Sequence, residues 1–148
     1  MLFFFLGNAH PGLTGIRNLG NTCFMNSIIQ CLASTEKLVK YFMSGGHRND
    51  LNRSNELGFR GEIAAEFSVI VRAMWDGHCR IISPRRFKHT LGQFNQQFVS
   101  NDQQDAQELL LFLLDGLHED LNRVKLIFHK ILFSSIPCPI FSQFYTQI

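Results

Sequence analysis

Apolar residues recur at helical spacing through most of the first 123 residues, and this pattern predicts a mainly helical chain. The first stripe predicts a helix that starts near Cys23, with apolar positions three and four residues apart at Met25, Ile28, Ile29 and Leu32. The same spacing predicts four further helices: 35–43, 62–75, one that follows an N-cap at Ser83-Pro84 and contains Phe87 and Leu91, and 103–122.

Two of these helices have well-defined apolar faces. The stripe of helix 62–75 consists of Ile63, Phe67, Ile70, Val71 and Met74. The buried face expected for helix 103–122 consists of Leu110, Leu113, Leu114, Leu117 and Leu121. Gly116 lies inside this last helix at a cost of about 1 kcal/mol relative to Ala, so the packing around it must compensate.

The segments between the helices are polar and rich in glycine. Residues 12–20 contain three glycines and are expected to form a loop, and residues 44–61 are expected to form a surface connection. Strand patterns are weak throughout residues 1–123. After Arg123 the composition changes: no acidic residue follows Asp120, and two prolines flank Cys138.

Composition adds limits on the class of protein. A chain of 148 residues with 45% hydrophobic residues forms one domain with a real core, and a net charge of +2 favours neither a nucleic acid nor a membrane surface as partner. The longest apolar run, Leu109 to Leu114, is too short to span a membrane. No C-x-x-C pair occurs among the four cysteines, Cys23, Cys31, Cys79 and Cys138, so we expect no metal site. We also expect no cofactor. The chain is not rich in disulfide-forming cysteines, which favours a reducing, cytoplasmic environment.

Cys23 is the candidate nucleophile. It follows Asn21 and Thr22, whose side chains are expected to cap the helix. Backbone N–H groups and the helix dipole at such a position favour the nucleophilic thiolate. Asn18, on a glycine-flanked loop, would curl back and donate its amide to a developing oxyanion together with the Cys23 N–H. The residues by themselves leave open the commoner alternative, in which Cys23 is a structural core cysteine.

Two strings of residues together point to one enzyme family. The string GIRNLGNTCFMNSIIQCL, residues 15–32, resembles the cysteine box of the ubiquitin-specific proteases, with Ile16 where Leu is common and Phe24 where Tyr is common. The string QQDAQEL, residues 103–109, resembles a second motif of the same family. The resemblance covers about residues 12–123, and its later part looks like the endosome-associated branch, ubiquitin-specific protease eight.

The resemblance implies both a fold and an activity. The fold would be the N-terminal helical lobe of a papain-like α+β cysteine protease domain, truncated before the sheet-containing lobe. The activity would be hydrolysis of the bond after the C-terminal glycine of ubiquitin, with Cys23 as nucleophile and Asn18 at the oxyanion. Asp105, Gln107 and Glu108 would bind the basic tail of ubiquitin, although Asp105 also fits a helix-start charge favoured by the dipole. The implied partners are ubiquitin and ubiquitinated proteins.

The chain also departs from the family pattern. None of its six histidines lies in the context of the family's catalytic histidine: His10, His47, His78, His89, His118 and His129. The Asp or Asn that orients that histidine is not found either, nor are the family's zinc-binding C-x-x-C pairs.

We therefore expect three segments, an apolar leader at 1–11, the family domain at 12–123 and an unrelated apolar tail at 124–148. Two alternatives to an active hydrolase stay open. One is a catalytically incomplete isoform or fragment that at most binds ubiquitin or a partner. The other is a small helical module with a structural Cys23.

Overall fold

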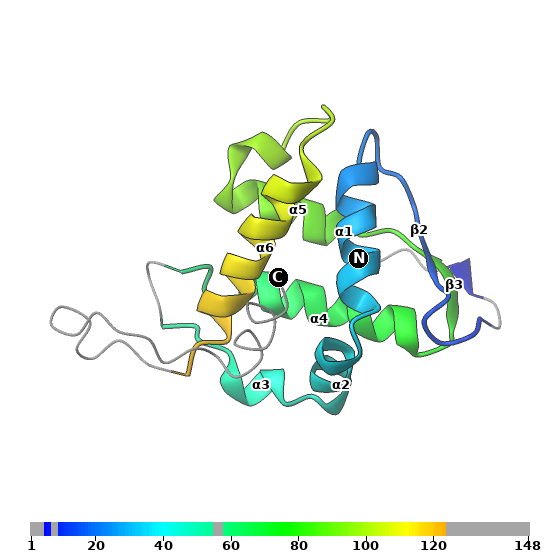
Figure 1. Ribbon diagram of the computed structural model, residues 1–148, viewed down its shortest axis with the longest axis horizontal. Helices are drawn as coiled ribbons and strands as arrows, with labels where there is room; N and C mark the ends of the chain where they lie inside the picture. The colour runs from blue at the N-terminus through cyan, green and yellow to red at the C-terminus, as the bar shows by residue number, and fades with distance from the viewer. Residues whose placement is uncertain (1–4, 7–8, 55–57, 124–148) are drawn as a thin grey trace, which may run out of the picture.

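The computed structural model describes residues 5–6, 9–54 and 58–123 (Figure 1). The predicted tail and most of the predicted leader therefore lie outside the described residues. Within these ranges the chain forms six α-helices and one short 3₁₀ helix: α1 Cys23–Ala33, α2 Glu36–Ser44, α3 His47–Asp50, α4 Glu62–Trp75, α5 Arg85–Phe94, η1 Gln96–Phe98 and α6 Ala106–Asp120. No helix in these ranges is long and apolar enough to cross a membrane. The mainly α fold class is confirmed.

Helix α4 lies at the centre of the core and packs against α2, α5 and α6, while α1 packs along α6 (Figure 1). All five residues of the stripe predicted for α4 are buried. The predicted face of α6 is partly correct, because Leu113, Leu117 and Leu121 are buried whereas Leu110 and Leu114 are half-buried. Gly116 faces α4 so closely that an added Cβ would lie 2.9 Å from Ile63 Cδ1. The close approach of the two helices compensates for the unfavourable glycine.

A small three-stranded sheet flanks the helices and was not expected from the sequence. Its strands are β1 Phe5–Leu6, β2 Gly15–Ile16 and β3 Cys79–Ile82, in the order β1-β3-β2. Strand β2 runs parallel to β3, and β1 runs antiparallel to it. The predicted loop at 12–20 therefore contains a strand, and so does the predicted leader. Two-residue strands carry no alternating pattern, so only pairing with β3 defines them.

The connection predicted at 44–61 is also more structured than expected. It contains α3, in which His47 is buried against the ring of Phe42, with ring centroids 5.1 Å apart. Asn52 is buried too, and its backbone N–H donates to Asp120 O at 2.8 Å. The segment is mostly exposed or half-buried, as a surface connection would be, but α3 and the contact with the end of α6 bind it to the core.

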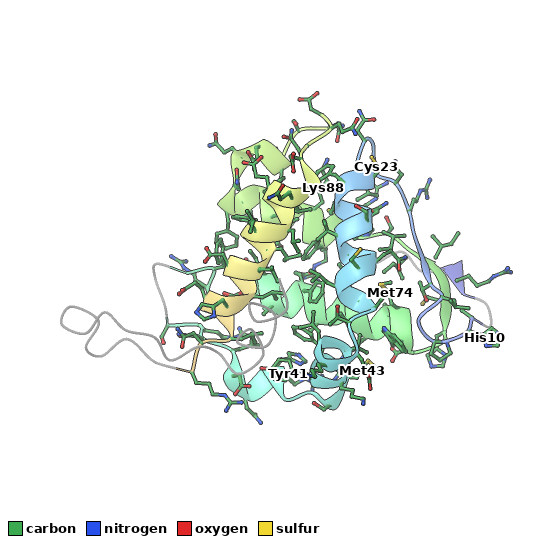
Figure 2. The ribbon with its side chains drawn as sticks, in the orientation of Figure 1. His10, Cys23, Tyr41, Met43, Met74 and Lys88 are labelled. Atoms are coloured by element: carbon green, nitrogen blue, oxygen red, sulfur yellow. The ribbon has the colours of Figure 1, made fainter. Side chains whose placement is uncertain are left out.

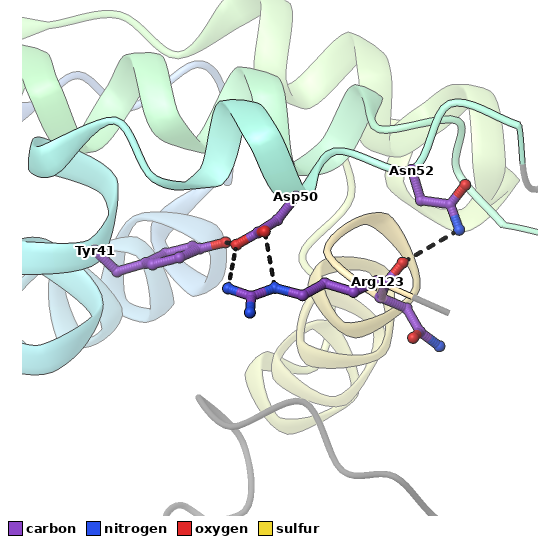
Figure 3. A network of polar contacts seen from close by, with 5 residues as sticks. Tyr41, Asp50, Asn52 and Arg123 are labelled. Carbon is purple, nitrogen blue, oxygen red and sulfur yellow. Dashed lines mark hydrogen bonds and ion pairs between the residues drawn. The ribbon is translucent and has the colours of Figure 1, made fainter. Parts of the chain in front are cut away.

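A network of polar contacts joins α2, α3 and the residues after α6 (Figure 3). The Asp50 carboxylate accepts a hydrogen bond from Tyr41 Oη at 2.7 Å and pairs with Arg123, with 2.8 Å between Asp50 Oδ1 and Arg123 Nε. Burial of Asp50 raises its pKa, but the hydrogen bonds from Arg123 and Tyr41 outweigh burial, so the pKa is lowered overall. At this end of the molecule the Asp50 carboxylate is therefore bound by side chains of the same chain.

Candidate functional site

Cys23 is the first residue of α1, and its side chain is exposed (Figure 2). Cys31 lies on the same helix and is also exposed, whereas Cys79 on β3 is buried. Burial raises the pKa of the Cys79 thiol, and the charge of Asp76 raises it further. Exposure therefore leaves Cys23 and Cys31 as the accessible thiols of the described residues, and their surroundings must distinguish them.

The loop before Cys23 is folded around the side chain of Asn18. Asn18 Oδ1 accepts hydrogen bonds from the Gly20 and Thr22 N–H groups at 2.9 and 3.2 Å, and from Thr22 Oγ1 at 3.2 Å. Gly20 and Asn21 both have positive φ, 106° and 49°, which turns the chain sharply into α1. Asn18 Nδ2 makes no hydrogen bond within the described residues, so it is free to donate to a bound group.

The predicted capping of α1 by Asn21 and Thr22 is wrong. Thr22 occupies the N-cap position but makes no side-chain hydrogen bond to the first turn, because its ψ of 21° departs from the extended conformation of most N-caps. Its Oγ1 instead accepts from the Leu19 N–H at 2.9 Å. The N–H groups at the start of α1, beside Cys23, therefore receive no acceptor from the N-cap side chain.

Polar residues of the cysteine box hold the loop in place from the other side. Asn26 Nδ2 donates to Ile16 O at 3.4 Å, and Gln30 Nε2 donates to Thr14 O at 3.0 Å. Because these two residues lie one helical turn apart, they bind β2 and the residue before it along the side of α1. Thr14 is itself anchored, since its buried Oγ1 donates to Cys79 O at 2.7 Å. The loop at 17–22 is thus held between a pinned strand and a packed helix.

The second motif begins α6. Asp105 is the N-cap, and its Oδ1 accepts from the Gln107 and Glu108 N–H groups at 2.6 and 3.1 Å. The helix therefore starts three residues later than the predicted start at residue 103. The other carboxylate oxygen of Asp105 makes no hydrogen bond within the described residues, and all three side chains are exposed. One oxygen of Asp105 thus serves the helix, while the other has no partner within the described residues of this exposed side chain.

The fold brings the two motifs to the same end of the molecule. The starts of α1 and α6 lie side by side there (Figure 1), and Asn21 Nδ2 donates to Asn101 O at 3.0 Å, which joins the two loops. This end carries Cys23, Asn18, Asp105, Gln107 and Glu108. The family model for ubiquitin carboxyl-terminal hydrolases matches residues 14–147.

The chain belongs to the ubiquitin carboxyl-terminal hydrolase family.

Curated relatives support this assignment. The chain is 53% identical over 118 residues to ubiquitin carboxyl-terminal hydrolase 15 of Homo sapiens, a match that covers 80% of this chain and 12% of that protein. It is 52% identical over 120 residues to hydrolase 4 of Bos taurus, covering 81% of this chain and 12% of that protein. The chain thus spans about an eighth of the length of these relatives. These relatives are named hydrolases 15 and 4 and do not show the predicted resemblance to branch eight, which stays a prediction.

Solved structures share the fold. The SAGA Ubp8/Sgf11/Sus1/Sgf73 DUB module bound to ubiquitin aldehyde matches with a TM-score of 0.63 and 24% identity, over 80% of this chain and 26% of that chain. The same module in another structure matches with a TM-score of 0.54 and 25% identity, over 76% of this chain and 25% of that chain. The family match extends to residue 147, whereas the predicted segment boundary at 123 rests on the change in composition and the extent of the motif resemblance, and it stays a prediction.

No histidine among the described residues is hydrogen-bonded to Cys23, although nucleophilic cysteines in this kind of chemistry pair with one. His10 lies at the far edge of the molecule (Figure 2), and His47 is buried against Phe42. His129 lies outside the described residues. The described residues also contain no group of three His, Cys, Asp or Glu side chains that could hold a metal ion.

Sequence reasoning misassigned the role of Thr22 and missed Asn101, and both residues shape the site. Thr22 orders the loop rather than the helix, and Asn101 receives the Asn21 amide from 80 positions away. The polar pair Asn26 and Gln30, inside an otherwise apolar stripe, was a usable signal that the helix binds a neighbouring strand. Nothing in the local pattern marks Asn101, because its role depends on the approach of two loops.

Proposed function

We propose that this chain provides the nucleophile and the ubiquitin-tail contacts of a cysteine-type deubiquitinase. Support comes from the family, whose curated relatives are ubiquitin carboxyl-terminal hydrolases, and from a structural neighbour bound to ubiquitin aldehyde. The observation that carries the proposal is an exposed Cys23 at a helix start that no side chain caps, next to an Asn18 amide that is free to donate. The substrates would be proteins joined to the C-terminus of ubiquitin, and the site of action the cytoplasm, where free thiols persist.

The chemical step would begin with attack of the Cys23 thiolate on the carbonyl carbon of ubiquitin's last glycine. The carbonyl oxygen gains the negative charge, and the Cys23 N–H and Asn18 Nδ2 are the donors that stabilise it. The C–N bond then breaks, the amine leaves after taking a proton from water, and a thioester links ubiquitin to Cys23. Water hydrolyses the thioester and frees the thiol.

Asp105 would hold the basic tail of ubiquitin. The carboxylate oxygen that does not cap α6 is available for a charge-assisted hydrogen bond from an arginine, while its other oxygen continues to cap α6. Gln107 and Glu108 are exposed on the following turn and would extend the same contact. Asp105 would then act both as the helix-start charge of α6 and as the contact for the ubiquitin tail, because each role uses a different oxygen.

A second candidate function is ubiquitin binding without turnover. It is favoured by the histidines, none of which is hydrogen-bonded to Cys23 within the described residues. General acid–base help is worth roughly 10²- to 10⁴-fold, and the leaving amine needs a proton. A chain that lacks this help would react once with an activated ubiquitin and would hydrolyse substrate very slowly.

The test treats the full chain with ubiquitin that carries a cysteine-reactive group at its C-terminus, and in parallel with a fluorogenic ubiquitin substrate. We expect labelling at Cys23, abolished in Cys23→Ala and retained in Cys31→Ala. Cys31 is the matched control because it is an exposed thiol on the same helix. Labelling that Cys31→Ala abolishes and Cys23→Ala leaves intact would refute the assigned nucleophile.

The two readouts separate the two functions. Labelling with hydrolysis supports the complete enzyme and requires a base that lies outside the contacts described above. Labelling without hydrolysis supports the binding fragment with a competent nucleophile. Absence of both, from a chain whose circular dichroism shows it folded, would contradict the proposal.

A further inference from the structure

A concave site lies beside the Cys23 loop and takes no part in the chemistry proposed above. It is a pocket of about 460 Å³ between α5 and the loops that carry Leu19 and Asn101. This volume is at the small end of the range for ligand sites, so it suits a small group rather than a large ligand. Cys23 does not line it, although Lys88, which does, lies at the same end of the molecule (Figure 2).

The walls of this pocket are basic. Arg85, Lys88 and His89 of α5 all line it, and no Asp or Glu does. The ion pairs of the described residues lie elsewhere, at Lys40–Glu36, Arg86–Glu66 and Arg123–Asp50. The Lys88 ammonium instead donates to the neutral side chain of Asn101, 2.8 Å from Nζ to Oδ1. The positive charge at this site is therefore not neutralised by a carboxylate within the described residues.

A neighbouring pocket provides a comparison. It occupies about 320 Å³, shares His89 and Gln93 with the first pocket, and is lined by three arginines, but Glu62 and Glu66 line it as well. Arg86 there is paired with Glu66. Since the carboxylates offset the cations, that pocket does not select an anion. Of the two pockets, the one next to the Cys23 loop is lined by Arg85, Lys88 and His89 without any Asp or Glu.

We infer that the pocket formed by Arg85, Lys88, His89, Leu19, Val99 and Asn101 binds an oxyanion of the phosphate-monoester class. Arginine and lysine form charge-assisted hydrogen bonds with phosphate oxygens, and the Asn101 amide adds a neutral partner. The phosphate would come from free inorganic phosphate or from a phosphorylated residue of a partner protein. The site borders the Cys23 loop, because Asn101 O also receives the Asn21 amide.

The experiment records amide chemical shifts of the ¹⁵N-labelled full chain during titration with inorganic phosphate, O-phosphoserine or serine, at constant ionic strength. Phosphate and phosphoserine should give saturable shifts at Leu19, Gly92 and Asn101, and serine should give none. Lys88→Gln and Arg85→Gln should each weaken binding roughly tenfold or more. Arg80→Gln is the matched control, since Arg80 is exposed on β3 and lies outside the pocket.

Tighter binding of phosphoserine would identify a phosphorylated segment as the source, and equal binding would identify free phosphate; both support the site. Shifts that spread over the basic surface, or that Arg80→Gln reduces as much as Lys88→Gln, would overturn it. Shifts that serine reproduces would overturn it as well. The proposal is independent of the hydrolase chemistry, because Cys23→Ala should leave phosphate binding unchanged.

Discussion

The starts of α1 and α4 present the same backbone groups in opposite settings. At the start of α4, the buried carboxylate of Asp120 accepts from the Gly61 and Ala64 N–H groups at 2.8 and 2.9 Å. At the start of α1, the N-cap side chain turns away and the first residue is an exposed cysteine. An anion supplied by the protein closes one helix start, while the other is left open to an anion from outside. The first arrangement stabilises the fold, and the second leaves room for the chemistry proposed for Cys23.

The start of α6 is intermediate between these two. Asp105 caps it as Asp120 caps α4, but Asp105 is exposed and only one of its oxygens is used. A cap in water is replaced by solvent when it is lost, whereas a buried cap is not. The three helix starts therefore predict different responses to removal of a carboxylate or hydroxyl.

Asp120→Ala is expected to have the largest effect. It leaves two buried N–H groups without an acceptor, which should lower the free energy of unfolding by about 2–4 kcal/mol. Asp105→Ala is the control for an exposed cap and should cost about 1 kcal/mol. Urea denaturation followed by circular dichroism measures both, and equal losses would show that burial does not distinguish the two caps.

Thr22→Val tests the open start of α1. The substitution keeps the shape of the buried side chain but removes the acceptor of the Leu19 N–H and a donor to Asn18. We expect a loss of about 1–2 kcal/mol of stability and slower labelling of Cys23 by reactive ubiquitin. Thr35→Val is the control, because Thr35 donates to Cys31 O at the other end of α1. Unchanged labelling in Thr22→Val would mean that the loop does not depend on this hydroxyl.

The buried His47, in α3, predicts that the stability of the fold depends on pH. Burial lowers its pKa, the charges of Arg72 and Arg48 lower it further, and Asp50 opposes them. The folded chain therefore binds a proton at His47 less well than the unfolded chain does. The contribution of neutral His47 to the free energy of unfolding should be fully present above pH 6.5 and should be lost as the pH falls below it. His47→Phe should show a smaller loss between pH 7 and 5. Parallel pH curves for the two proteins would contradict the assignment to His47.

Asp105→Asn should have the smallest effect on stability and a selective effect on binding. Asn caps helices about as well as Asp, so the free energy of unfolding should change by roughly 0.5 kcal/mol or less. Loss of the charge should weaken the binding of ubiquitin, measured by calorimetric titration. The control is Asp102→Asn, which removes an exposed charge from the preceding loop. If both variants bind ubiquitin equally well, the proposed role of Asp105 is wrong.

Local patterns in the sequence were enough to predict the main helices and the family. The stripes of α1 and α4 are periodic over several turns, so each helix buries the face that its own residues define. The family strings place Cys23 and Asn18 within five positions of each other, and a loop of that length keeps them close together in any fold. The polar Asn26 and Gln30 belong to the same short string.

What the sequence could not provide are the contacts between distant segments. Asp120 caps a helix that begins about 59 positions earlier, Asn101 meets Asn21 across 80 positions, and β2 is a strand only because β3 lies beside it. The same holds for His47, which is buried because α3 folds back onto Phe42. Periodicity reports how a segment divides its surface between core and solvent, but it does not say which partner covers that surface. Packing of α4 against α2, α5 and α6 decides those partners, and with them which helix start is closed and which is left open.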